Sequence, residues 1–117
     1  MTGECVKPDD CATMAEVRHG VDRLDEAIVA LLGERFRYMD AAARIKQGRA
    51  DVRDEARKAE VIGNALRLAA GAGIPAAVIE RLYELLVEAS IGYELDAFDR
   101  RARRKTAPHE AGREAQP

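Results

Sequence analysis

Two cations stand where the sequence pattern calls for apolar side chains. Apolar residues recur with helical spacing from Met14 onward, and later steps of the stripe fall on Arg35 and on Ile45/Lys46. Arg35 and Lys46 are eleven residues, or three helical turns, apart, so they share a face about 16 Å apart along the axis. Burial of a cation in an apolar core costs free energy unless an anion pairs with it. The spacing therefore indicates a site for a small anionic molecule.

Each cation alone has an ordinary explanation, either snorkelling at the rim of the core or pairing with a nearby carboxylate. Two of them on one stripe, followed by Asp54 and Arg57 at the start of the next helical pattern, favour the anion site. Arg18 lies about 25 Å before Arg35 along the same helix and about 100° around it. We therefore expect Arg18 to reach such a site only from a second copy of the chain.

The sequence lacks the residue sets that nucleophilic, metal-dependent and phosphate-binding enzymes need. No Ser-His-Asp set, HExxH motif or phosphate-binding loop can be assembled. The two cysteines, Cys5 and Cys11, form neither a disulfide framework nor a full zinc site, so we expect no metal and no cofactor. His19 is interpreted as a surface residue. A helical pocket lined by Arg and Lys suits a small dicarboxylate whose reaction needs charge stabilisation rather than a nucleophile.

The elements that position these residues are predicted to be three helices. The first covers residues 14–46 and begins at a capping box of Thr13 and Glu16. After a loop over 47–53, a second helix starts near Asp54 and ends at residues 71–73, and Pro75 opens a third. The chain is thus predicted to be all-α, with an N-terminal extension over 1–13, a helical domain over 14–100 and a basic tail over 101–117.

The first helix is too long for the rest of the chain to cover. Thirty-three residues span about 50 Å, whereas a compact domain of about 100 residues has a radius of gyration near 13 Å. We therefore expect an intertwined helical homodimer. A simple coiled coil is the alternative, and Asp22, Asp25 and Arg35 in the seam disfavour it.

Composition and charge exclude further classes of function. The 117 residues are 47% hydrophobic and 34% charged with a net charge of −2, which indicates a globular chain with no bulk attraction to nucleic acid. The longest uncharged stretch, residues 68–79, is too short to cross a membrane, and no secretory signal is recognisable, so we expect a cytoplasmic protein. The basic run over 100–105 is interpreted as a solubilising tail, with docking onto an acidic partner enzyme as the alternative.

Several segments resemble the all-α chorismate mutase family. They are Val17-Arg18, Val21–Asp25, Ile28–Arg35, Ala42–Lys46 and Val52–Arg57. The likeness covers about residues 14–98. The segment Pro8–Cys11 and the short loop over 47–51 are more similar to the isochorismate pyruvate lyases, a branch of the same fold.

The resemblance implies a dimer with two equivalent pockets, each completed by Arg18 of the other subunit. By position, Arg18 would grip one substrate carboxylate, Arg35 would hold the other, and Arg57 would lie beside the ring. These three arginines would keep the substrate compact.

The resemblance also assigns the groups around the reacting bond. Lys46 would donate to the ether oxygen as the C–O bond breaks, and Asp54 would bind the ring hydroxyl. Ser90 and Glu94 would complete the wall of the pocket, with Glu94 beside Lys46 where the family usually has Gln. Lys58 stands where mutases of this family often place a glutamate that contacts the ring hydroxyl.

The sequence therefore predicts a chorismate mutase that converts chorismate to prephenate by a Claisen rearrangement in a cationic pocket. Asp54 and the segment 52–57 favour this activity. An isochorismate pyruvate lyase, which yields salicylate and pyruvate, is the first alternative, and an aminodeoxychorismate mutase would suit Lys58 and Glu94. A helical dimerisation module without catalysis is the third, but it has no use for Arg35 and Lys46 on an inner stripe.

Overall fold

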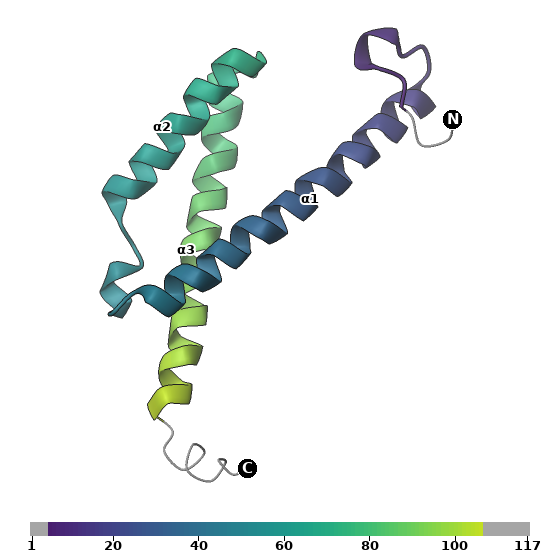
Figure 1. The fold of residues 1–117 in the computed structure, drawn as a ribbon. Coiled ribbons are helices and arrows are strands. Elements are labelled where there is room, and N and C mark those ends of the chain that lie inside the picture. Colours follow the sequence, from purple (N-terminus) through teal and green to yellow (C-terminus); the bar gives the residue numbers. More distant parts are fainter. Residues whose placement is uncertain (1–4, 107–117) are drawn as a thin grey trace, which may run out of the picture. The chain divides into compact units, whose positions relative to one another are not determined.

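The computed structural model describes residues 5–106, which form helices and no strand. Its elements are the short 3-10 helices η1 (Pro8–Asp10) and η2 (Arg49–Asp51) and the α-helices α1 (Met14–Ile45), α2 (Glu55–Ala72) and α3 (Ala76–Thr106) (Figure 1). The prediction of three helices with a long first one is confirmed. The chain divides into two compact units, one up to Arg37 and one from Tyr38 onward.

The predicted capping box at the start of α1 is present. The Glu16 backbone N–H donates to Thr13 Oγ1 at 3.1 Å, and the Thr13 N–H donates to Glu16 Oε1 at 3.2 Å. These bonds satisfy backbone donors that a helix N-terminus otherwise leaves unpaired. The start of α1 is therefore fixed by local sequence.

Both ends of α2 also follow local rules. The Asp54 carboxylate accepts a hydrogen bond from the Arg57 backbone N–H at 3.0 Å and caps the first turn. Gly73 ends the helix in the left-handed conformation with φ 76°, which glycine adopts at little cost. The carbonyl of Pro75 then accepts from Val78 N–H at 3.1 Å in the first turn of α3.

The third helix is longer than predicted. We expected a basic tail from residue 101, but α3 continues to Thr106, and residues 107–117 lie outside the described residues. Arg, Ala and Lys are good helix formers even without an apolar face. The last turn also carries three positive charges that interact favourably with the negative end of the helix dipole: Arg103, Arg104 and Lys105. Docking of a partner enzyme on this basic run stays a prediction.

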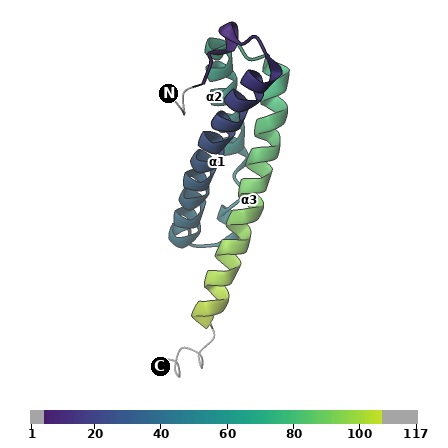
Figure 2. The same ribbon diagram turned by 90° about the vertical axis from the view of Figure 1, so that its right-hand side faces the viewer.

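The core of the second unit lies between α2, α3 and η2. The helix α2 packs antiparallel along α3, as both views show (Figures 1 and 2), and η2 contacts α3. Val52, Val87 and Ile91 form the buried cluster, with partly buried residues packed around it: Val61, Ile62, Leu95 and Phe98. This packing brings the loop after α1 and the start of α2 against the middle of α3. No described helix is long and apolar enough to span a membrane.

The first unit consists of η1 and most of α1. The apolar stripe predicted for this helix is present, and its side chains are 38–65% exposed: Val17, Val21, Leu24, Ile28 and Leu31. Contiguous apolar surface on a helix marks an interaction face.

Candidate active site

Lys46 and Glu94 form an ion pair between the end of α1 and the middle of α3. Lys46 Nζ lies 2.7 Å from Glu94 Oε2, and the two side chains are 29% and 6% exposed. Oε2 is buried and accepts no hydrogen bond of good geometry from any described residue. Its contact with the Lys46 ammonium is therefore a close ion pair without a well-directed hydrogen bond. A buried carboxylate with one cationic partner binds that partner tightly. The pair therefore holds the Lys46 ammonium in place.

Two further contacts fasten the segment around Lys46 to α3. The Tyr93 hydroxyl donates to Asp40 Oδ1 at 2.9 Å, and Arg49 Nε donates to Asp99 Oδ1 at 2.9 Å. The bond to Asp40, reinforced by partial burial, raises the pKa of Tyr93, so it remains a donor at neutral pH. Neither contact was predictable from the helical pattern, because each joins residues about fifty positions apart. The Lys46 side chain thus stands on a segment held on both flanks.

Ser90 lies one helical turn before Glu94 on α3 and is buried, 5% exposed. Its hydroxyl donates to the Leu86 carbonyl at 2.7 Å, within the same helix. The hydroxyl proton is therefore used within the helix.

Asp54 and Arg57 lie at the exposed N-terminus of α2. The Asp54 carboxylate caps the helix, which explains an acid at this position without any ligand. The Arg57 guanidinium lies 2.8 Å from Glu60 Oε1. The Arg57–Glu60 ion pair is open to solvent, so an anionic ligand could compete with Glu60 for the guanidinium.

The structure places the seven predicted site residues in two groups. The second unit contains five of them: Lys46, Asp54, Arg57, Ser90 and Glu94. The first unit contains Arg18, which is exposed, and Arg35, which is half-buried. Lys46 and Glu94 are joined through their side chains, and Asp54 accepts from the backbone N–H of Arg57.

An ionic network that the sequence analysis missed joins the start of α2 to α3. Arg53 binds Glu88 through two bonds, Nη2 to Oε1 at 2.7 Å and Nη1 to Oε2 at 3.1 Å. Lys58 Nζ donates to Glu84 Oε2 at 2.7 Å and to Glu88 Oε2 at 2.6 Å. Opposite charges are abundant along the chain, so their types alone did not indicate which of them meet.

This network predicts a loss of stability in acid. Arg53, then Lys58, lower the pKa of Glu88 to about 2 by donating hydrogen bonds to it. A lowered carboxyl pKa stabilises the fold above the unfolded pKa and loses that contribution as the pH falls towards the folded value. Between about pH 5 and pH 2 the melting temperature should therefore fall less steeply for Glu88→Gln than for the native chain. Parallel slopes in thermal melts followed by circular dichroism would contradict this assignment.

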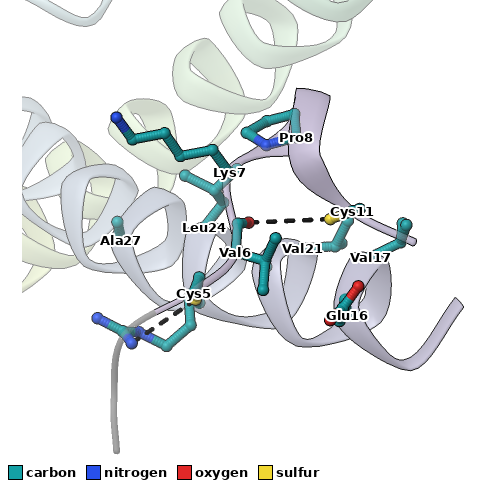
Figure 3. A pocket seen from close by; sticks show the side chains of 12 residues that line it. Cys5, Val6, Lys7, Pro8, Cys11, Glu16, Val17, Val21, Leu24 and Ala27 are labelled. Atoms are coloured by element: carbon teal, nitrogen blue, oxygen red, sulfur yellow. Dashed lines mark hydrogen bonds between the residues drawn. The ribbon is translucent and has the colours of Figure 1, made fainter. Parts of the chain in front are cut away.

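A hollow of about 790 Å³ lies in the first unit, between the segment before α1 and the first turns of α1 (Figure 3). Its walls are mainly apolar and include Val6, Pro8, Val21 and Leu24. None of the seven predicted site residues lines it. An apolar hollow does not suit a dicarboxylate, so we do not assign the substrate to it.

Comparison with known proteins gives two matches. The family model described as chorismate mutase type II matches residues 17–95. An isochorismate pyruvate lyase from Pseudomonas aeruginosa is 34% identical over 80 residues, which cover 68% of this chain and 79% of that protein. The range matched by the family model contains all seven predicted site residues. Among the described residues, no group of three or more His, Cys, Asp or Glu could hold a metal ion.

Proposed function

Because this chain belongs to the type II chorismate mutase family, we propose that it breaks the enolpyruvyl ether bond of chorismate and rearranges it to prephenate. The Lys46–Glu94 pair is the observation that carries the proposal. It holds an ammonium group 2.7 Å from a buried carboxylate, on a segment fastened to α3. Such a positioned cation can donate to an ether oxygen that gains negative charge.

The rearrangement needs little more than position and charge. It is unimolecular, so it requires no nucleophile and no base, and the substrate has only to be held in a compact conformation. As the ether C–O bond breaks and a C–C bond forms between the enolpyruvyl methylene carbon and the ring, electron density accumulates on the ether oxygen, and the Lys46 ammonium stabilises it. Ser90, one helical turn before Glu94, is assigned to the wall of the pocket by its position in the family.

The two carboxylates of the substrate need further cations. From their positions in the family we assign the carboxylates to Arg35 of one subunit and Arg18 of the other. By the same positions we assign Asp54 to the ring hydroxyl and Arg57 to a place beside the ring. The exposed apolar face of α1 supports a homodimer, since a partner helix would bury it.

Replacement of Glu94 by glutamine gives a specific prediction. An ionised carboxylate beside Lys46 would repel the negative charge that develops on the ether oxygen, whereas a neutral group can donate a hydrogen bond there. Glu94→Gln should therefore keep activity, because an amide donates without carrying a charge. Values of kcat for both proteins at saturating substrate provide the measurement.

Loss of activity in Glu94→Gln would contradict this expectation. It would mean that the reaction requires the ionised carboxylate that holds the Lys46 ammonium in this structure.

An isochorismate pyruvate lyase is the second candidate, and a specific observation favours it. The relative with 34% identity carries that name, and the helix-capping role of Asp54 removes one reason for preferring the mutase. Cleavage of isochorismate breaks the equivalent ether bond, so Lys46 would serve the same purpose.

The two functions are separated by offering the purified chain chorismate and isochorismate in separate reactions and identifying the products. Prephenate from chorismate as the preferred reaction supports the proposal. Preferred release of salicylate and pyruvate from isochorismate supports the second candidate. No turnover of either substrate would favour a dimerisation module without catalysis.

A further inference from the structure

The first turn of α2 is fastened to α3 on both of its flanks. Just before it, Arg53 forms two hydrogen bonds with Glu88, and within it Lys58 bonds to Glu88 and to Glu84. Glu88 is the only described carboxylate that binds both cations. The carboxylate of Glu88 therefore bridges the two flanks.

The residues between these flanks are the ones assigned to the substrate. Asp54 follows Arg53 directly, and Arg57 precedes Lys58. Any rotation or sliding of this turn along α3 would move both side chains relative to Ser90 and Glu94, which lie on α3 itself. The register of α2 against α3 thus sets the geometry of this half of the site.

Apolar packing alone holds this turn weakly. Val52 is the one buried residue in the segment 51–60, and it contacts the cluster of Val87 and Ile91. Residues 53–57 are all exposed. The Lys58 side chain, 17% exposed, is the most enclosed member of the ionic network. Directional hydrogen bonds between charged groups add orientation to the packing of Val52 and, further along α2, of Val61 and Ile62.

We propose that Glu88 is a positioning residue, which sets the orientation of the substrate-binding residues Asp54 and Arg57 by holding Arg53 and Lys58 against α3. This inference rests on the proposed function, because it uses the assignment of Asp54 and Arg57 to the substrate. The proposal also gives Lys58 a role that needs no contact with the substrate. Its ammonium, paired with Glu84 and Glu88, helps to hold the start of α2 against α3.

Glu84 provides a matched control for Glu88. Both are glutamates on α3, one turn apart, and both accept a bond from Lys58, but only Glu88 also binds Arg53. Glu88→Gln should raise KM about threefold to tenfold with kcat nearly unchanged, because binding groups used equally in ground and transition states are displaced. Glu84→Gln should change KM less than about twofold. Arg53→Gln, which removes the other end of the same bond, should reproduce the effect of Glu88→Gln.

A double-mutant cycle separates positioning from general stability. If Glu88 acts through Arg57, then Glu88→Gln should raise KM far less in an Arg57→Ala background than in the native chain. A merely structural role would lower the melting temperature and leave the two KM effects multiplicative. Unchanged KM in both Glu88→Gln and Arg53→Gln, or multiplicative effects with Arg57→Ala, would overturn the proposal.

A second measurement keeps this test independent of the proposed function. Amide hydrogen exchange over residues 52–60 should be faster in Glu88→Gln than in Glu84→Gln, with the helix content of both variants unchanged. If neither chorismate nor isochorismate is turned over by the native chain, the proposed function fails. The exchange data then test by themselves whether Glu88 positions the start of α2. Equal exchange in the two variants would then overturn the positioning role, and faster exchange in Glu88→Gln alone would support it.

Discussion

Replacing Lys46 by methionine is expected to lower kcat about a hundredfold to a thousandfold, the range found when one preorganised donor to a developing negative charge is removed. Methionine keeps the length of the side chain and removes the ammonium. The cation lies 2.7 Å from a buried carboxylate and on a segment held by Asp40–Tyr93 and Arg49–Asp99, so no other described lysine is placed to replace it. Single-turnover measurements with saturating substrate would report the loss directly.

Glu94→Gln is the matched control for Lys46→Met. Both variants break the same ion pair, but only Lys46→Met removes the donor. Lys46→Met also leaves a buried carboxylate unpaired, so its fold must be checked by circular dichroism at the assay temperature. If both variants lose activity to the same extent, the pair matters as a structural unit. If Lys46→Met retains kcat within about tenfold, Lys46 is not the donor to the ether oxygen.

Features that depend on neighbouring residues were predictable from the sequence. The capping box of Thr13 and Glu16, the cap at Asp54 and the left-handed Gly73 all occur where the sequence analysis placed a helix end. Each of these features involves bonds over a few residues, so the types and spacing of those residues determine the result. The family resemblance rested on such spacing along α1 and at the start of α2.

Features that depend on the register between helices were not predictable in this way. The network of Arg53 and Lys58 with α3, and the bond of Tyr93 to Asp40, join positions that a helical pattern cannot align. The basic tail predicted from residue 101 differs from the structure for another reason. The lack of an apolar face after residue 100 favoured a tail, whereas Arg, Ala and Lys continue α3 to Thr106 by their own helix propensity.

The predicted crossing of Arg18 between subunits gives the second large effect. Arg18→Ala and Arg35→Ala should each be almost inactive as homodimers, because every pocket lacks one of the two arginines that hold the carboxylates. In a mixed dimer, one pocket combines the native Arg35 of one chain with the native Arg18 of the other. Random exchange of equal amounts makes half of the dimers mixed, each with one intact pocket of two, so about a quarter of native activity per chain should return.

A matched mixture tests the same geometry in the opposite direction. The double variant Arg18→Ala/Arg35→Ala, exchanged with an equal amount of native chain, should make every mixed dimer inactive, since the native chain's pocket then receives no Arg18. Activity per native chain should fall to about half, because half of the native chains end in mixed dimers. If both arginines served a pocket from the same chain, the single variants would not restore activity and the native chain would lose none. Native mass spectrometry of differently tagged chains confirms that exchange has occurred, and a chain that stays monomeric at micromolar concentration would exclude the crossing altogether.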